Sequence, residues 1–194
     1  MPRVFHFGTL DSTNEEALRQ LAQGAEAPLW IVADEQSQGR GRNGRAWKSP
    51  KGNLYASLLL KLSADVSVAA GLSFVAALAA YDAVAAHISP EQRQHLRLKW
   101  PNDVLLGGAK AAGILIESFS RAKGGVMAIA GIGINVSVAP AGTGRPVTAL
   151  GDDPSVCEPV FEALAAAFEI WLARWNEGAG FGDIRLAWLD RAHA

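Results

Sequence analysis

The sequence predicts an α/β (α+β) fold in which helices pack on a mixed, largely antiparallel sheet. Short apolar or alternating runs that are typical of strands are interspersed with four helical stretches. A Gly107-Gly108 pair inside one of these runs predicts a hairpin, and therefore an antiparallel pair of strands. With 194 residues, 49% of them hydrophobic, the chain is long enough for one full-sized core. We therefore expect a single domain over residues 1–194.

The first half of the chain predicts three strands and two helices. The strands are expected at Val4–Phe7, Pro28–Ala33 and Asn53–Leu62, the last of them more central. The first helix is expected from Ser12 to Gly24, where Ser12-x-x-Glu15 has the spacing of a capping box. An alanine-rich helix from about Val66 to His87 should lie on a face of the sheet and end at Ser89-Pro90.

The second half predicts four further strands, two of them in a hairpin, and two helices. A strand at Leu96–Trp100 precedes the hairpin over residues 104–117, a turn at 121–125 and a strand at 126–136. Gly131 and Gly133 in the last strand should mark a close approach by another group, because glycine weakens a strand unless something needs the room. After a Pro/Gly loop at 139–154, helices are expected at 159–175 and 184–191, and the helical spacing of their apolar residues predicts core positions.

Composition excludes several classes of function. The net charge of −1 argues against a general nucleic-acid surface, and Val66–Tyr81 is too short and too alanine-rich for a membrane span. The single cysteine, Cys157, rules out an intrachain disulfide and suits a reducing cytoplasm. The N-terminus has no signal-peptide pattern, and the spacing of the 4 histidines predicts no metal cluster.

The basic loop Gly39–Trp47 combines flexible glycines with arginine forks, a composition that favours binding of an anion. Gly39-x-Gly41-x-x-Gly44 fits the dinucleotide fingerprint, but no helical periodicity follows it, as that motif requires. Gly41-Arg-Asn-Gly44 also fits the GXXG clamp of RNA-binding KH domains, a weak four-residue match. A solvated surface loop is the remaining interpretation.

A second polar centre follows the predicted strand at 96–100. Lys99-Trp100-Pro101-Asn102-Asp103 places a cation, an amide and a carboxylate together, and Lys110 follows seven residues after Asp103. Packing alone would not select this set. Asn135 ends a glycine-bearing strand in the same way. If these strands are neighbours in the sheet, their polar ends converge near the basic loop.

Four motifs stand in order along the chain: Gln36 with Gly39–Trp47, Lys99–Asp103, Lys110–Glu117 and Gly131–Asn135. Together they resemble the motifs of biotin protein ligases, the biotin–[acetyl-CoA-carboxylase] synthetases, from about Asp11 to Asn135 and more loosely through the last helices. The resemblance implies the biotin/lipoate ligase fold and a two-step reaction. ATP and biotin first give biotinyl-5′-adenylate and pyrophosphate. A lysine of a biotin carboxyl carrier protein then attacks the mixed anhydride.

Carried over by position, the resemblance implies two sets of site residues. Thr13 and its neighbours would meet the ureido ring of biotin, while the loop arginines and Lys110 would bind the carboxylate and phosphate oxygens. Arg42 and Lys110 would be catalytic, and Mg²⁺ would be held through the phosphates, with Asn102 as a candidate ligand. The biotin set is Ser12, Thr13, Asn14, Gln36, Arg40, Gly41, Arg42, Lys110 and Gly113. The ATP and adenylate set is Gly39, Arg42, Arg45, Trp47, Lys99, Asn102, Asp103 and Asn135.

The resemblance also implies partners and assembly. The expected partner is the biotin carboxyl carrier protein of acetyl-CoA carboxylase, in the cytoplasm, with no nucleic acid and no membrane; a homodimer is compatible with the family. The basic loop would be a mobile lid that is ordered over the acyl adenylate. The alternatives are a lipoate or octanoyl ligase of the same fold and a non-catalytic RNA- or ligand-binding module.

The chain departs from the family pattern in two ways. Ala111 or Ala112 stands where leucine is common, a volume change that we do not expect to alter the chemistry. The sequence also stops at Ala194, where the family usually continues into a small SH3-like domain, and it shows no N-terminal winged helix. We therefore expect a catalytic domain without these two appendages, and no binding to operator DNA.

Overall fold

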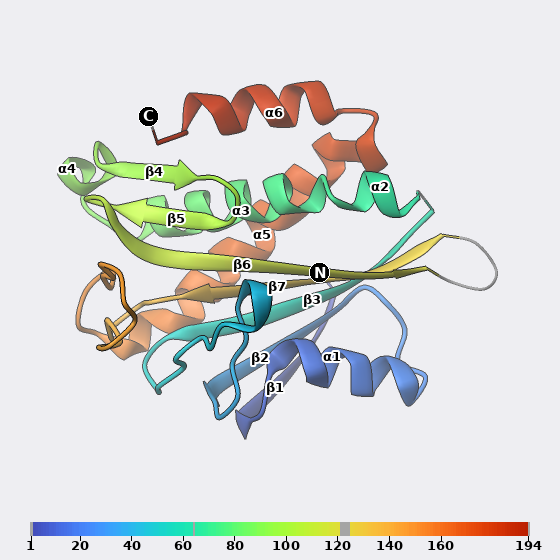
Figure 1. Ribbon diagram of the computed structural model, residues 1–194, viewed down its shortest axis with the longest axis horizontal. Coiled ribbons are helices and arrows are strands. Elements are labelled where there is room, and N and C mark those ends of the chain that lie inside the picture. The colour runs from blue at the N-terminus through green and yellow to red at the C-terminus, as the bar shows by residue number, and fades with distance from the viewer. Residues whose placement is uncertain (1, 64, 121–124, 194) are drawn as a thin grey trace.

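A seven-stranded sheet with helices on both faces forms the protein, as a computed structural model describes it for residues 2–63, 65–120 and 125–193 (Figure 1). The strand order is β1-β2-β3-β7-β6-β5-β4, and only β1 and β2 pair in parallel. The predicted fold class is confirmed. The strands are β1 (Arg3–Leu10), β2 (Leu29–Gln36), β3 (Leu54–Leu62), β4 (Leu96–Lys99), β5 (Asp103–Leu106), β6 (Ala109–Ser120) and β7 (Val126–Ile134).

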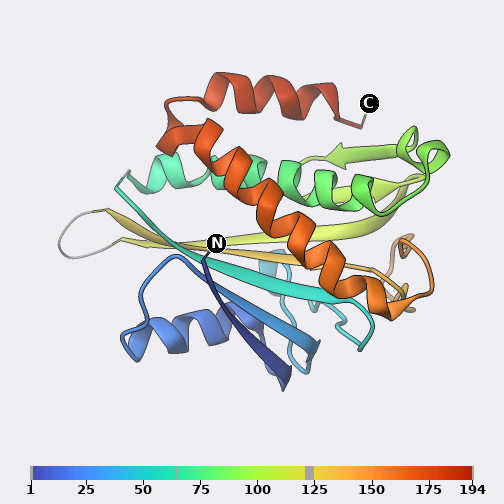
Figure 2. The same cartoon turned by 180° about the vertical axis from the view of Figure 1, so that it is seen from behind.

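The two faces of the sheet differ in how much they bury, because alternate residues of each strand point to opposite sides. Ala128, Ala130 and Ile132 of β7 face the main core, whereas Met127 and Ile129 face a smaller cluster under α1. Figure 2 shows α5 running diagonally across the sheet over the main core. The helices are α1 (Thr13–Ala22), α2 (Val66–Ala69), α3 (Leu72–Ala86), α4 (Pro90–Arg93), α5 (Cys157–Trp175) and α6 (Phe181–Asp190).

Most predicted elements are present, and several are longer than expected. β1 and β2 each run to eight residues, so Gln36 lies at the end of a strand and not in the loop. The hairpin turns at Gly107-Gly108 as predicted, with positive φ at both glycines. The predicted turn at 121–125 falls largely outside the described residues. The aromatic residues Phe161, Phe168 and Trp175 of α5 are buried in the main core, as their helical spacing predicts.

The predicted helix over 66–87 is interrupted. It breaks into α2 and α3 around Gly71, where a Cβ atom would stand 2.7 Å from Nε1 of Trp175. By length and composition the stretch Val66–Ala86 could cross a membrane, but α3 lies in the main core against α5. The chain then begins α4 at Pro90, where Ser89 and Gln92 form a reciprocal capping box; the sequence predicts only a helix end at Ser89-Pro90.

The predicted capping box at Ser12 is wrong. Ser12 is the N-cap of α1, but its side chain makes no capping hydrogen bond. The carboxylate of Asp11 accepts from the Ser12 N–H at 2.7 Å, and the Gln36 side chain accepts from the Thr13 N–H at 2.8 Å. Asp11 is held in turn by a bidentate contact with Arg19, which lowers the pKa of Asp11 to about 2. Asp11 therefore accepts from the N-cap N–H that the capping box was expected to bond, and the contact from Gln36 of β2 ties the start of α1 to the sheet.

Candidate active site

The floor of the site is built from two rows of paired residues on the α1 face of the sheet. In the first row Gly131 of β7 lies between Ser57 of β3 and Leu115 of β6. In the second row Gly133 pairs with Tyr55 on one side and with Gly113 on the other, and Gly113 pairs with Asp103 of β5. The missing side chains of these glycines leave room above the strands, as predicted for Gly131 and Gly133.

The room above the first row is taken by the start of α1. A Cβ atom at Gly131 would collide with the side-chain amide of Asn14. The Ser57 hydroxyl lies 2.6 Å from Asn14 Oδ1 and 2.7 Å from Thr13 Oγ1, and Thr13 Oγ1 donates to Gln36 Oε1 at 3.1 Å. The Gln36 amide donates to Ser49 Oγ at 2.9 Å. We call Ser12, Thr13, Asn14, Gln36 and Ser57 the polar compartment. The first four, with Arg40 and Trp47 among others, line a space of only about 30 Å³, and Ser57 supports them from below.

The room above the second row is taken by the basic loop. Arg40 and Ala46 form an antiparallel bridge, and a short 3₁₀ turn at Arg42–Gly44 closes the loop into a narrow ribbon. This folds Trp47 back onto the sheet, where a Cβ atom at Gly133 would stand 2.6 Å from the indole Nε1. Gly39 is equally crowded, since its Cβ would lie 2.5 Å from Ser49 Oγ. We call residues 39–47 the lid.

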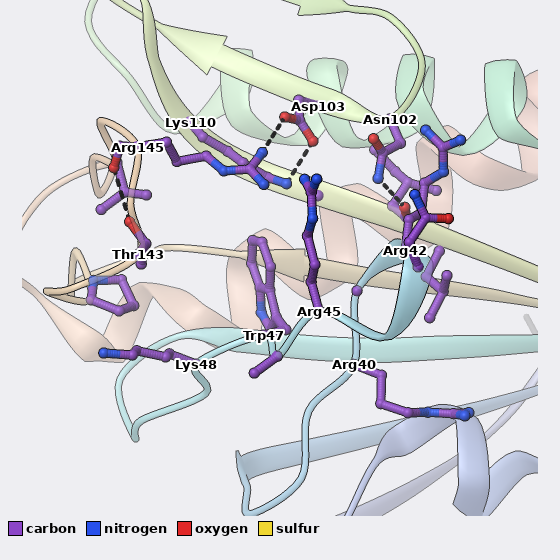
Figure 3. Close-up of a pocket in the computed structure, with 18 of the residues that line it drawn as sticks. Arg40, Arg42, Arg45, Trp47, Lys48, Asn102, Asp103, Lys110, Thr143 and Arg145 are labelled. Carbon is purple, nitrogen blue, oxygen red and sulfur yellow. Dashed lines mark hydrogen bonds and ion pairs between the residues drawn. The ribbon is translucent and has the colours of Figure 1, made fainter.

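A larger cavity of about 560 Å³ opens beside Trp47 and is lined by basic side chains (Figure 3). At its base Lys110 Nζ lies 2.5 Å from Asp103 Oδ1, and Arg145 Nη1 lies 3.2 Å from Asp103 Oδ2. The same ammonium lies 4.8 Å from the centroid of the Trp47 ring. Trp47 thus lines both the cavity and the polar compartment. We call the 560 Å³ cavity the basic cavity. The charged residues that line it are Arg40, Arg42, Arg45, Lys48, Lys99, Asp103, Lys110 and Arg145.

Burial governs the electrostatics of Lys110. Removal of the ammonium from water lowers its pKa, and Asp103 opposes that shift by stabilising the charged form. Arg145 and Arg45 lower the pKa further through repulsion. One carboxylate therefore faces several cations, and the cavity carries an excess of positive charge that a bound anion would neutralise.

Two amide side chains complete the base of the cavity. Asn102 donates to the carbonyl of Ile114 at 2.8 Å, and Asn135 donates to the carbonyl of Thr148 at 3.1 Å. The buried Oδ1 atom of Asn135 has no partner among the described residues. Within the described part of the chain no group of three or more His, Cys, Asp or Glu side chains could hold a metal ion. Amide oxygens are nevertheless among the hard oxygen donors that Mg²⁺ accepts.

The structure brings most of the predicted residues together, in two neighbouring groups. Ser12, Thr13, Asn14 and Gln36 line the polar compartment, while Gly41, Lys99 and Asn102 line the basic cavity with the residues described above. Arg40 lies against α1 and β6: its guanidinium lies 2.5 Å from Glu15 and 3.2 Å from Glu117, and Figure 3 shows it directed away from Lys110. Glu117 also accepts from the Asn14 amide at 2.7 Å.

Sequence reasoning missed the contribution of the loop at 139–151. Arg145 and its neighbours line the basic cavity, and the Lys48 ammonium donates to the carbonyl of Ala141 at 2.6 Å. In sequence this stretch reads as an ordinary Pro/Gly connection. Ser57 and Glu117 were also missed as site residues, because each gains its role only from a partner that is distant in sequence.

Comparison with known proteins identifies relatives over most of the chain. Residues 7–135 match the biotin/lipoate A/B protein ligase family. The chain is 47% identical over 191 residues to the biotin–[acetyl-CoA-carboxylase] ligase of Paracoccus denitrificans, an alignment that covers 94% of this chain and 78% of that protein. It is 35% identical over 130 residues to the bifunctional ligase/repressor BirA of Escherichia coli, covering 66% of this chain and 39% of that protein.

Solved structures agree with the sequence relatives. The biotin protein ligase of Aquifex aeolicus in complex with biotin and ATP superposes with a TM-score of 0.77 at 26% identity, covering 99% of this chain and 79% of that one. The biotin protein ligase of Leishmania major in complex with biotinyl-5-AMP gives a TM-score of 0.75 at 26% identity, covering 100% of this chain and 82% of that one. The fold of this chain and its ordered sequence motifs therefore both agree with the same group of relatives.

Proposed function

The chain belongs to the biotin/lipoate A/B protein ligase family, and we propose that it is a biotin–[acetyl-CoA-carboxylase] ligase that activates biotin with ATP and transfers it to a lysine of the carrier protein. One observation carries the proposal. A small compartment of mostly uncharged polar groups and a larger basic cavity adjoin, and Trp47 lines both, together with Arg40 and Leu115. This arrangement suits a reaction that joins a neutral ring with a carboxylate tail to a nucleotide.

The chemistry needs positive charge where the two substrates meet. A biotin carboxylate and an α-phosphate repel each other, and the transition state concentrates their charge on a few oxygens. Lys110 stands at the junction, beside Trp47 and Gly113, so its ammonium is the group best placed to bind those oxygens. Arg42 lies in the lid on the cavity side and would add its guanidinium when the lid closes. No covalent enzyme intermediate is needed for this route.

Biotin itself would enter the polar compartment. The hydrogen-bonding groups of Ser12, Thr13, Asn14 and Gln36 suit the ureido ring, whose N–H and C=O groups need partners when buried. The compartment of about 30 Å³ is the size of one water molecule, so we infer that Trp47 and the lid shift to admit the ring. The ATP side would use Arg45, Lys99, Asn102, Asp103 and Asn135, with Trp47 near the adenine.

Mg²⁺ fits the donor set in a limited way. The free Oδ1 of Asn135 and the amide of Asn102 supply oxygen donors, and the phosphates would supply the rest. The ion would reduce the negative charge of the triphosphate.

We infer that the transfer step takes place in the cytoplasm, where the single cysteine stays reduced. The reaction would involve no nucleic acid, and a homodimer is compatible with it.

The test is biotin-dependent exchange of labelled pyrophosphate into ATP by the purified protein with Mg²⁺. We expect exchange with biotin and none with lipoate or octanoate. Transfer is then scored as streptavidin-detected biotin on a carrier domain of acetyl-CoA carboxylase, with a carrier whose acceptor lysine is changed to arginine as the control. Exchange with lipoate alone would overturn the proposal in favour of a lipoate ligase. Retention of RNA with neither acid active would favour a binding module.

A further inference from the structure

Asp103 is a buried carboxylate held between two cations from different parts of the chain. Its side chain is 11% exposed and that of Lys110 is 9% exposed, while that of Arg145 is 41% exposed. Lys110 takes one carboxylate oxygen and Arg145 takes the other. Figure 3 shows Arg145 reaching from the 139–151 loop to the same carboxylate as Lys110.

An ion pair between Asp103 and Lys110 alone would hinder the reaction. If Asp103 faced Lys110 alone, an ammonium that turned to a substrate oxygen would leave a buried carboxylate without a counter-charge. That loss is strongly unfavourable in a protein interior. With Arg145 on the second oxygen, Asp103 keeps a cation at every stage.

We propose that Arg145 is a positioning residue for adenylation: it keeps Asp103 neutralised, so that the Lys110 ammonium is free to bind the carboxylate and phosphate oxygens of the substrates. The inference rests on the function proposed above. Arg145 is not required to touch either substrate.

The loop does not depend on the Arg145 side chain for its place. The Lys110 N–H donates to the carbonyl of Pro146, and the Thr148 N–H donates to the carbonyl of Lys110, each at 3.0 Å. Asn135 holds the carbonyl of Thr148, and Lys48 holds that of Ala141. Loss of the guanidinium should therefore leave the loop on the sheet and remove only the charge beside Asp103.

The first experiment measures kcat and KM in biotin-dependent pyrophosphate exchange for Arg145→Gln, Arg145→Lys, Asp103→Asn and the Asp103→Asn/Arg145→Gln double variant. Arg145→Gln should lower kcat about tenfold with the KM for ATP within about threefold of wild type, and Arg145→Lys should stay within about threefold. In the Asp103→Asn background, where no carboxylate remains to be neutralised, Arg145→Gln should change kcat less than about twofold. Equal losses in both backgrounds would overturn the proposal, as would a fully active Arg145→Gln.

A second experiment needs no turnover, so it still decides the question if Asp103→Asn is inactive. Calorimetry measures ATP binding to Asp103→Asn and to Asp103→Asn/Arg145→Gln, with melting temperatures as the folding control. Since Arg145 is proposed to act by neutralising Asp103, the two affinities should agree within about twofold when that carboxylate is absent. A further loss of about tenfold would make Arg145 a direct phosphate ligand and overturn the inference. Failure of the wild-type protein to exchange pyrophosphate with biotin would instead refute the proposed function.

Discussion

The polar compartment and the basic cavity share a wall, yet they are stabilised in opposite ways. In the polar compartment neutral groups bond to one another: Ser57 meets Thr13 and Asn14, and Thr13 meets Gln36. In the basic cavity one carboxylate, Asp103, faces several cations. The first network is largely closed, whereas the second lacks negative charge.

The difference indicates how binding and chemistry are divided. A pre-formed neutral network fixes a ring with little rearrangement, which favours recognition. Unpaired positive charge in a site shielded from water stabilises charge that develops during a reaction. Changes in the polar compartment should therefore appear mainly in the KM for biotin, and changes at Lys110 mainly in kcat.

Lys110→Gln should have the largest effect. Loss of the buried ammonium removes the cation at the junction, and we expect kcat for pyrophosphate exchange to fall by about 10²- to 10³-fold, as for other lost oxyanion donors. Steady-state exchange measures it, with Lys110→Arg, which keeps the charge, as the matched control. A rise in the KM for biotin at unchanged kcat would remove the proposed division between the two regions.

Gly131→Ala should have the next largest effect, in the other region. The new methyl group would collide with the Asn14 amide and displace the start of α1. We expect the KM for biotin to rise about 10- to 100-fold, since small displacements of positioning groups cost that much, with the KM for ATP nearly unchanged. Gly8→Ala is the control, because a Cβ atom at Gly8 in β1 meets nothing within 4 Å. An equal rise in both KM values would show that the two compartments are not separable.

The sequence predicts those features of the fold that depend on local patterns, and it does not predict those that depend on partners distant in sequence. Alternating strands, helical spacing and the Gly107-Gly108 turn depend on local patterns, and the structure confirms them. Features that depend on distant partners were not foreseen. Trp175 packs against Gly71, where the long helix is interrupted, and Asp11 and Gln36 bond the first N–H groups of α1 in place of the capping box expected at Ser12.

The site follows the same rule. The ordered motifs placed the lid, Asp103, Lys110 and Asn135 in one neighbourhood, and the structure brings them together. The directions of the side chains depend on neighbours that the sequence does not reveal. Arg40 lies between Glu15 and Glu117, and Arg145 enters the cavity from a loop whose composition is ordinary.

Arg42→Ala should have a smaller effect, because Arg42 is exposed and lies in the loop over residues 39–47 that we propose as a lid. We expect the adenylate to dissociate about tenfold faster, as when a lid loses one charged contact. The melting temperature should change by less than about 2 °C, since exposed loop residues contribute little to stability. Release of radiolabelled biotinyl-adenylate measures the dissociation rate, and calorimetry measures the melting temperature. Loss of folding would contradict the assignment of residues 39–47 as a lid.

The smallest effect near neutral pH should come from the titration of Lys110. Burial lowers the pKa of this ammonium from its usual 10.5, so exchange activity should decline on the alkaline side at a lower pH than a solvated lysine would give. Stability should respond with the opposite sign. Between the folded and unfolded pKa values the unfolded chain binds more protons, so this group makes unfolding less favourable as pH rises. Lys110→Arg, which stays protonated, should remove both trends in pH profiles of exchange and of chemical denaturation. If the alkaline decline persists in Lys110→Arg, another group in the basic cavity controls it, and the contrast between the two regions no longer rests on Lys110.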